Sequence, residues 1–438
     1  MAKTLREPRV FAFLAIFLLT FILHALSRNA TPFDSRWSTY VAMSILREGN
    51  TNLDEYAPVL QANDYYMLRE IDGHYYNFYP IGVPLLAAPF LAAGAPFFSW
   101  IIGQPLHQFM LERNMGRIEV CIASFFVALN AALFCAIGLA SGLRLRAAIL
   151  LACIFAFATP AWSTASRALW QHGPSMLMFT LALWLIQISE RNSRLAALSA
   201  LPLAYACVIR PTNLLALALL GGCVFWRHRK QFPLWIVLTV ALLAPFAWYN
   251  FSVYGSLLSG YTLDLYDAKR MPFWMGFTGT LFSPSRGLFI WSPILLTAFW
   301  GGWLLWRDKR WTALETALAA LLAAQWIVIS AYPVWWGGHS IGPRYCCEMT
   351  PILIYFMIPV LRRYGFAGWI ELRLHAVIYA ALILALGLSV FTHARGANAG
   401  GCVAWNVTPV NIASEISRLW DWSDPQFLRA MPAKPSNR

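Results

Sequence analysis

An acidic residue beside a hydrophobic segment is the first feature of this chain that could take part in chemistry. Asp34 lies in the polar stretch 31–37, shortly after the apolar run 10–26. A charged side chain so close to hydrocarbon is costly unless it has a function. Its carboxylate could accept a proton from an attacking hydroxyl group, as group-transfer reactions require. It could equally be the N-cap of the amphipathic stretch 37–48, so the residue types leave both interpretations open.

Two further acids follow Asp34 on the same polar loop. Asp54 and Glu55 are adjacent, and paired carboxylates can bind a divalent metal or divide acid and base roles between them. A solvated turn also explains two adjacent acids. A divalent metal is therefore compatible with the sequence, but none of the eight cysteines has the spacing of metal ligands.

Isolated basic residues are the candidates for binding a phosphate. Guanidinium presents a planar fork of donors that matches phosphate oxygens, and these arginines stand apart from the clustered basic residues elsewhere in the chain. Salt bridges to the neighbouring acids are the alternative. The phosphate-binding candidates are Arg36, Arg270, Arg286, Arg344 and His339.

Polar and aromatic residues on the same segments are candidates for contact with a sugar or an acceptor. An aromatic ring can stack on the apolar face of a pyranose, although tryptophan also anchors proteins at membrane interfaces. The candidates for these contacts are Asp54, Glu55, Arg69, His74, Tyr79, Trp335 and Trp336.

The composition is that of a membrane protein with many spans. Of the 438 residues, 59% are hydrophobic and 12% are charged, whereas a soluble protein carries about 25% charged residues. The net charge of +13 is explained by basic cytoplasmic loops, and we expect no nucleic-acid partner. No small-residue cleavage site follows the first apolar run, so we expect a first span rather than a signal peptide.

Eleven apolar runs could cross a bilayer, which needs about 20 helical residues. They are 10–26, 118–140, 147–162, 173–189, 195–209, 211–226, 232–249, 288–306, 312–332, 349–361 and 374–391. The stretch 80–103 is also long and apolar, but prolines interrupt it. If it does not span, every basic loop falls on one side of the membrane, as the positive-inside rule requires. We therefore predict an all-α bundle of about 11 transmembrane helices.

The same charge pattern predicts which side each segment faces. Residues 1–391 form one transmembrane domain with a cytoplasmic N-terminus, and the loop 27–117 is a large periplasmic loop with surface-lying helices. The tail 392–438 is periplasmic as well. Cys346, Cys347 and Cys402 would then face an oxidising compartment, and whether Cys402 pairs with either of the other two stays open.

Four stretches resemble a known family by their order and their shared outer placement. They begin at Asp34-Ser-Arg-Trp, Asn77-Phe-Tyr-Pro-Ile-Gly-Val-Pro-Leu-Leu, Ser283-Pro-Ser-Arg-Gly-Leu-Phe-Ile-Trp-Ser-Pro and Trp335-Trp-Gly-Gly-His-Ser-Ile-Gly-Pro-Arg-Tyr. With the pattern of spans, they resemble the glycosyltransferase C (GT-C) superfamily. The similar branch is that of protein O-mannosyltransferases and lipid A aminoarabinose transferases, a family 39-like group.

The resemblance implies a GT-C-type bundle and an inverting glycosyltransferase of the cell envelope. Such an enzyme takes a hexosyl or pentosyl group from a polyprenyl-phosphate sugar donor on the outer side of the bacterial inner membrane. Asp34 matches the acidic residue of the family's first loop and would be the general base. The acceptor would be a lipid, a polysaccharide or a protein.

This chain departs from the family pattern at two positions. Family members often have Asp-Glu where this chain has Asp34-Ser35, and they place a lysine before the proline-rich segment where this chain has none. Arg69 or His74 would have to replace that lysine, or Arg270 and Arg344 would bind the donor phosphate instead.

Other classes of membrane protein share some of these features. A polysaccharide ligase or a lipid phosphotransferase would also use outer-face arginines and a lipid phosphate. A transporter or flippase is less compatible, because transporters show internal repeats and midplane charges. This sequence has no repeat and most of its charges lie at the edges of the apolar runs, while Arg210-Pro211, the exception, is an outer turn on the predicted topology.

Overall fold

The computed structural model describes residues 7–112, 115–257, 271–365 and 375–430. The α-helices are α1 (Glu7–Ala25), α2 (Arg36–Arg47), α3 (Ala57–Gln61), α4 (Gly82–Ile102), α5 (Leu106–Glu112), α6 (Gly116–Ala140), α7 (Leu145–Phe157), α8 (His172–Ile188), α9 (Arg194–Leu198), α10 (Ala200–Ile209), α11 (Leu214–Arg227), α12 (Phe232–Tyr254), α14 (Phe273–Phe282), α15 (Leu288–Trp291), α16 (Thr297–Arg307), α17 (Ala313–Ser330), α18 (Thr350–Phe356), α19 (Ile358–Tyr364), α21 (Ala376–Asn398) and α22 (Gly400–Ala404). Short 3₁₀ and π turns connect them, including η2 (Ala161–Ala165), η5 (Pro293–Leu296) and η6 (Arg344–Met349). Two strands, β1 (Leu68–Ile71) and β2 (His74–Asn77), form one hairpin.

The expected apolar runs lie in helices, but these helices differ greatly in length. Among the described residues, six are long and apolar enough to cross a membrane, or seven if the bent pair α18 and α19 counts as one span. The count of eleven spanning helices is therefore not confirmed. Pro359 near the start of α19 removes a backbone donor where this pair bends by 41°.

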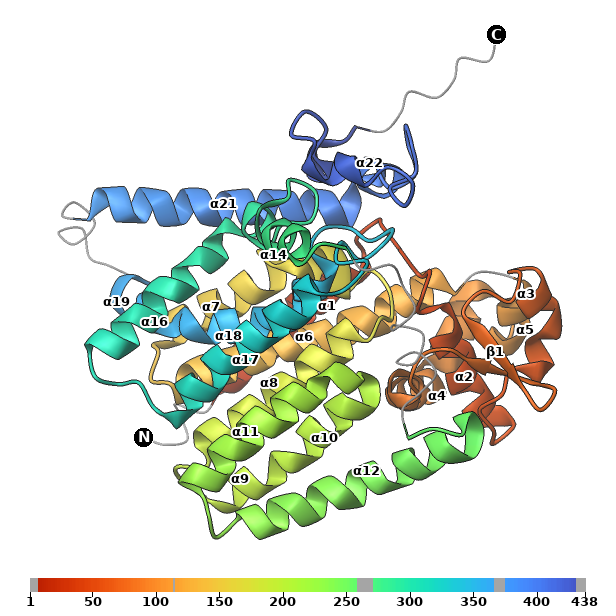
Figure 1. Cartoon of the computed structure of the whole chain (residues 1–438), viewed down its shortest axis with the longest axis horizontal. Helices are drawn as coiled ribbons and strands as arrows, with labels where there is room; N and C mark the ends of the chain where they lie inside the picture. Colours follow the sequence, from red (N-terminus) through yellow and green to blue (C-terminus); the bar gives the residue numbers. More distant parts are fainter. Residues whose placement is uncertain (1–6, 113–114, 258–270, 366–374, 431–438) are drawn as a thin grey trace.

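Helix α4 runs in a different direction from the long helices of the bundle. It is seen nearly end on in Figure 1, whereas α6, α12 and α21 run across the view. Pro89 and Pro96 lie inside it. By length and composition alone α4 could span a membrane, although the sequence pattern predicts that this stretch lies at the surface.

One large apolar core holds the bundle together. It joins α6, α7, α8, α10, α11, α17 and α18 through fully buried residues such as Phe134, Leu183 and Leu318. Most of these side chains face other helices, while α12 and α21 keep long apolar faces exposed. Exposed apolar faces of this size are expected where a protein contacts lipid.

A second core fixes the polar segment after α1. The amphipathic helix α2 buries Trp37, Tyr40 and Val41 against α4 and α6, and the Trp37 indole donates to the carbonyl of Tyr66 at 2.7 Å. The hairpin that follows was not predicted. Asp72 and Gly73 turn it with positive φ angles of 52° and 82°, and Asp-Gly is a favoured pair for such a two-residue turn.

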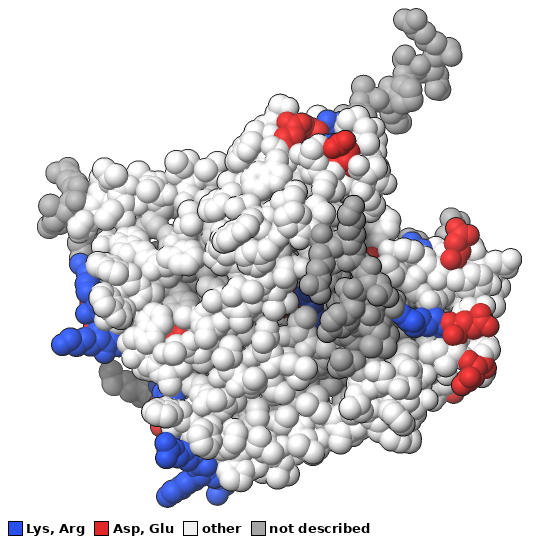
Figure 2. Space-filling view, in the orientation of Figure 1, with Lys and Arg blue, Asp and Glu red and all other residues white. Residues whose placement is uncertain are grey.

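Charged residues gather at the two ends of the bundle. In Figure 2, Lys and Arg lie at the end where α16 and α19 finish, while acids lie at the opposite end over the hairpin and α3, with others on the C-terminal segment. The middle of this face is almost free of charge. This is the pattern of a protein whose helices cross a membrane between two aqueous sides.

The segment after α21 folds back onto the bundle through one buried arginine. Arg286 donates to the carbonyl of Trp336 at 2.9 Å, to Gln426 at 2.5 Å and to Asn406 at 2.7 Å, and only 2% of its surface is exposed. Its guanidinium also lies over the ring of Trp405. Arg286 therefore joins the loop that carries Trp336 to the C-terminal segment.

The eight cysteines are all free thiols. Cys402 donates to the carbonyl of Arg395 and belongs to a small cluster with Trp291 and Ile341, whereas Cys346 and Cys347 belong to the large core. A disulfide between Cys402 and either of the other two is therefore not present.

We predict that Arg286→Met detaches the C-terminal segment. The substitution leaves buried carbonyl and amide oxygens without their donor, which should lower the free energy of unfolding by about 3 kcal/mol. Thermal unfolding in detergent and limited proteolysis beyond Asn398 would measure both effects. The same change at exposed Arg28 should alter stability by less than ~0.5 kcal/mol, and equal effects of the two substitutions would contradict a clamping role.

Candidate functional site

The segment that carries Asp34 is held in place by two buried charged residues. Ser35 donates to the carboxylate of Glu119 on α6, which also accepts from the backbone of Leu169 at 3.2 Å. The carbonyl of Arg167 accepts from Thr31 at 2.9 Å. Glu119 and Arg167 are 1% and 0% exposed, so the polar stretch after α1 has a fixed position.

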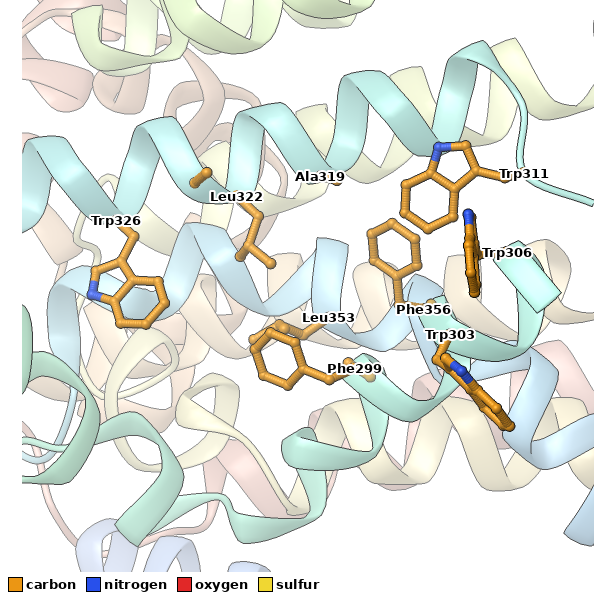
Figure 3. Close-up of a pocket in the computed structure, with 12 residues that line it drawn as sticks. Phe299, Trp303, Trp306, Trp311, Ala319, Leu322, Trp326, Leu353 and Phe356 are labelled. Carbon is orange, nitrogen blue, oxygen red and sulfur yellow. The ribbon is translucent and has the colours of Figure 1, made fainter.

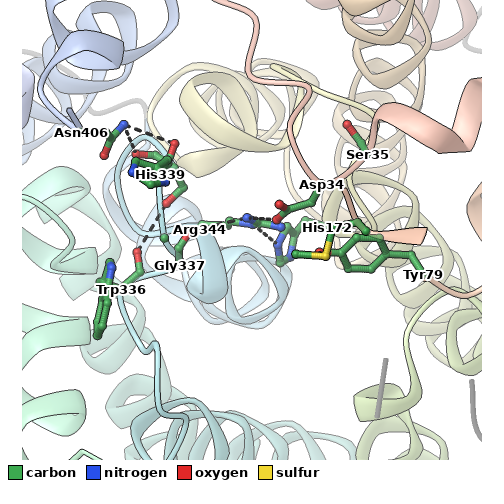
Figure 4. Close-up of polar contacts among 12 residues, drawn as sticks. Asp34, Ser35, Tyr79, His172, Trp336, Gly337, His339, Arg344 and Asn406 are labelled. Carbon is green, nitrogen blue, oxygen red and sulfur yellow. Dashed lines mark hydrogen bonds and ion pairs between the residues drawn. The ribbon is translucent and has the colours of Figure 1, made fainter. Parts of the chain in front are cut away.

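Asp34 forms an ion pair with Arg344. Its Oδ2 lies 2.6 Å from the Arg344 Nη1, and the two side chains are 19% and 12% exposed. The Tyr66 hydroxyl donates to the other carboxylate oxygen at 3.3 Å. Partial burial and the charge of Asp34 raise the pKa of Tyr66 to about 12, so Tyr66 stays protonated as a donor. Figure 4 shows the Asp34 and Arg344 side chains pointing toward each other.

Three further contacts fix the direction of the Arg344 side chain. Its guanidinium lies 4.1 Å from the centre of the Trp170 ring, a favourable cation–π arrangement. Its Nε donates to Nε2 of His172 at 3.2 Å. Gly337 turns beside it with a φ of +75°, and a Cβ at that position would lie 3.2 Å from the Arg344 Cβ. Gly337 thus leaves room for Arg344.

The buried ion pair of Arg210 and Glu348 fixes the imidazole ring of His172. Nδ1 of His172 lies 2.8 Å from Oε1 of Glu348, and Arg210 donates to the same oxygen at 2.7 Å. Because Nε2 accepts from Arg344, the ring proton belongs on Nδ1, where it is donated to Glu348. The chain Glu348–His172–Arg344 therefore aims the guanidinium at Asp34.

A cavity of about 390 Å³ opens next to the ion pair. Its lining includes Asp34, Tyr66, Tyr79, His339 and Arg344. A smaller cavity of about 120 Å³ continues from Tyr345, Arg210 and Glu348 to the apolar side chains of Leu215, Val328 and Ile329. The site thus combines an acid, guanidinium groups and a nearby apolar recess.

The structure brings together some of the residues that the sequence singled out. Asp34, Tyr79, His339 and Arg344 line the larger cavity. Arg36 does not line it and instead donates to Asn63. Arg286 is enclosed under the C-terminal segment, with Trp335 and Trp336 buried in a neighbouring cluster. Arg270 lies outside the described residues.

The remaining candidates belong to the hairpin and its surroundings. Glu55 accepts from Ser44, and the Arg69 guanidinium lies 5.2 Å from the Phe78 ring centre. Burial alone would raise the pKa of Asp54, but hydrogen bonds from His74 and from the backbone of Tyr75 lower it below its ordinary value. These residues do not line the cavities around Asp34.

The part of the chain that the structure describes has no group of three His, Cys, Asp or Glu side chains arranged to hold a metal ion. The acids nearest the cavity are paired with basic side chains. Asp34 is paired with Arg344, and Glu348 with Arg210 and His172.

Several residues of the site were missed from the sequence. His172, Arg210 and Glu348 lie at the ends of apolar runs, where each can be explained as the edge of a span. Their signal was that ionisable residues bordering hydrocarbon usually face a polar cavity or a partner. Nothing in the sequence indicated that these three meet, because they come from α8, the end of α10 and η6.

Comparison with solved structures shows that the fold is similar to that of ArnT, the lipid A aminoarabinose transferase, from Cupriavidus metallidurans. The apo structure has a TM-score of 0.51 at 12% identity, covering 97% of this chain and 75% of ArnT. The structure bound to undecaprenyl phosphate has a TM-score of 0.51 at 14% identity, covering 89% and 69%. The expected resemblance is therefore confirmed at the level of the fold.

Comparisons at the level of sequence add no assignment. No family model matches this chain, and no curated protein matches it. Similarity at 12–14% identity concerns the fold, so the assignment of chemistry depends on the site itself.

We predict that Glu348→Gln destabilises the protein strongly. It removes the carboxylate that accepts from both Arg210 and His172, and breaking a buried ion pair typically costs about 3–5 kcal/mol. Replacing both partners, as in Arg210→Met with Glu348→Met, should recover much of that loss because the buried pair is then removed as a whole. Thermal unfolding of the variants would measure this.

The matched control is the exposed pair of Arg227 and Glu190, whose acid is 58% exposed. Glu190→Gln should change the free energy of unfolding by about 1 kcal/mol or less. A Glu348→Gln variant as stable as Glu190→Gln would contradict the buried-pair interpretation.

Proposed function

We propose that the protein is a membrane glycosyltransferase that transfers a sugar from a polyprenyl-phosphate donor to an acceptor hydroxyl, with inversion. The observation that carries the proposal is the pairing of Asp34 with Arg344 at 2.6 Å beside a cavity of about 390 Å³. A base and a phosphate-binding cation are the two groups that this reaction requires. The ArnT fold, known with undecaprenyl phosphate bound, supports the choice of donor.

In the proposed reaction Asp34 is the general base. It accepts the proton of the acceptor hydroxyl while the oxygen attacks the anomeric carbon. The bond between that carbon and the phosphate oxygen breaks with its electron pair, and polyprenyl phosphate leaves. Arg344 stabilises the negative charge that grows on the leaving phosphate, and Tyr66 orients the carboxylate through its hydrogen bond.

The ion pair couples donor binding to the release of the base. A donor phosphate competes with Asp34 for Arg344, because both are anions that seek the same guanidinium. His172 holds the Arg344 guanidinium by accepting from its Nε. The terminal nitrogens of Arg344 meanwhile exchange the Asp34 carboxylate for the donor phosphate. The carboxylate is then free to meet the acceptor only when a donor is present.

The apolar recess beside Glu348 is suited to the first units of the polyprenyl chain. Leu215, Val328 and Ile329 line it, and Val328 is 44% exposed, so the recess lies close to the expected lipid phase. Figure 2 shows acids at one end of the bundle and most of the bases at the other, which favours a site on the outer side of a bacterial inner membrane. The loop 27–117 and the tail 392–438 would then be periplasmic.

We predict that Asp34→Asn lowers the rate of polyprenyl-phosphate release by at least ~100-fold, the usual contribution of a general base. The measurement is phosphate-lipid release from a panel of polyprenyl-phosphate sugars by purified protein. The matched control is Asp54→Asn, which removes an acid outside the cavity and should retain most activity. Full activity of Asp34→Asn would transfer the role of base to another residue.

We predict that Arg344→Lys raises the KM for the donor by about tenfold or more. Lysine keeps the charge but loses the Nε contact to His172 and the planar fork that matches a phosphate. Steady-state kinetics against donor concentration would measure the change. Arg36→Lys, the same substitution outside the cavity, should leave KM within about twofold of wild type. A similar KM in both variants would argue against phosphate binding by Arg344.

A further inference from the structure

A polar cavity lies at the basic end of the bundle, away from the Asp34 site. Its volume is about 410 Å³, and helix ends from separate parts of the chain meet around it. Its charged lining residues are Glu190, Arg227, Arg310, Glu315 and Arg362. The candidate active site uses none of them.

The acids of this cavity are already satisfied, whereas two arginines are not. Glu190 pairs with Arg227. Glu315 lies in the first turn of α17 and accepts from Thr312 and from the Tyr355 hydroxyl.

Within the described ranges, the other two arginines have no acidic partner. Arg362 donates there to a neutral carbonyl, that of Ser141. Among the described residues, the Arg310 side chain has no hydrogen bond or ion pair. Three arginines therefore face two carboxylates in this cavity, and the net charge of +1 that remains attracts a phosphate group.

An apolar groove begins on the other side of the same connection. The segment between α16 and α17 gives Arg310 and Thr312 to the cavity and Trp311 to a groove of about 480 Å³, which Trp306 at the end of α16 also lines. Figure 3 shows Trp303, Trp306 and Trp311 at one end of this groove and Trp326 at the other. Polar side chains contribute almost nothing to its walls, which are Trp, Phe, Leu, Ala and Gly.

The groove fits within one leaflet of a bilayer. Its lining residues on α17 run from Ala319 to Trp326, a rise of about 10 Å at 1.5 Å per residue, and half of the hydrocarbon core is ~15 Å. Tryptophans at its basic end occupy the position where these residues prefer to lie, between headgroups and hydrocarbon. The Arg307 guanidinium covers the Trp303 ring at 4.8 Å and pairs with Asp308 at 2.8 Å.

We propose that this end of the protein binds an anionic glycerophospholipid, with its phosphate between Arg310 and Arg362 and one acyl chain in the groove along α17. The headgroup cavity supplies charge selectivity, and the groove supplies apolar contact that a soluble phosphate cannot use. The site is separate from the Asp34 cavity, so the proposal does not depend on the transfer reaction.

The test uses delipidated full-length protein in detergent and native mass spectrometry with defined lipids. Phosphatidylglycerol should bind about tenfold more tightly than phosphatidylcholine, because each basic residue near an anionic headgroup contributes to binding. The double variant Arg310→Gln with Arg362→Gln should lose that preference. The matched double variant Lys309→Gln with Arg363→Gln removes two neighbouring charges outside the cavity and should keep it.

A second variant separates the groove from the headgroup cavity. Ala323 is an exposed groove residue on α17, and Ala323→Trp should weaken phosphatidylglycerol binding by about tenfold because it fills the space of the acyl chain. Equal loss of preference in both double variants would overturn the proposal. So would displacement of the lipid by glycerol 1-phosphate at comparable concentration, since that would make the site one for a soluble phosphate.

Discussion

The ion pair between Asp34 and Arg344 is the interaction on which the candidate site depends. Opposite charges in a partly buried position are tolerated only when each has a partner and further hydrogen bonds. Arg344 meets this condition through Trp170 and His172, and His172 in turn needs Glu348. The polar chain that results is continuous from the first loop to α10. A single partly buried carboxylate is therefore supported by residues from several distant parts of the chain.

The apolar bundle makes such a chain necessary. Its helices bury their mutual contacts and leave outer faces such as those of α12 and α21 to lipid. Polar side chains are consequently driven to the ends of the helices, where they pair with one another or line cavities. The two ends then differ in chemistry. One end combines an acid with guanidinium groups, and the other carries a surplus of positive charge around Arg310 and Arg362.

The sequence indicated Asp34 and Arg344, which lie at one end of this polar network, but not the residues behind them, His172, Glu348 and Arg210. Asp34 and Arg344 were selected as single residues because a charge beside hydrocarbon, or an isolated outer arginine, needs a reason. The same reasoning selected Arg286, which the fold uses to hold Asn406 and Gln426. An arginine that binds a ligand and one that holds two segments together look alike in sequence, because both are isolated guanidinium groups in polar loops.

The sequence by itself determined the class of fold and the sites where polar residues concentrate. Apolar runs of span length form helices whatever their neighbours are, because a backbone in hydrocarbon must satisfy its own hydrogen bonds. Only the tertiary structure decided that Asp34 meets Arg344 and that Glu348 supports His172. These outcomes depend on contacts between segments far apart in the chain, and local pattern contains no information on which distant side chains will face each other.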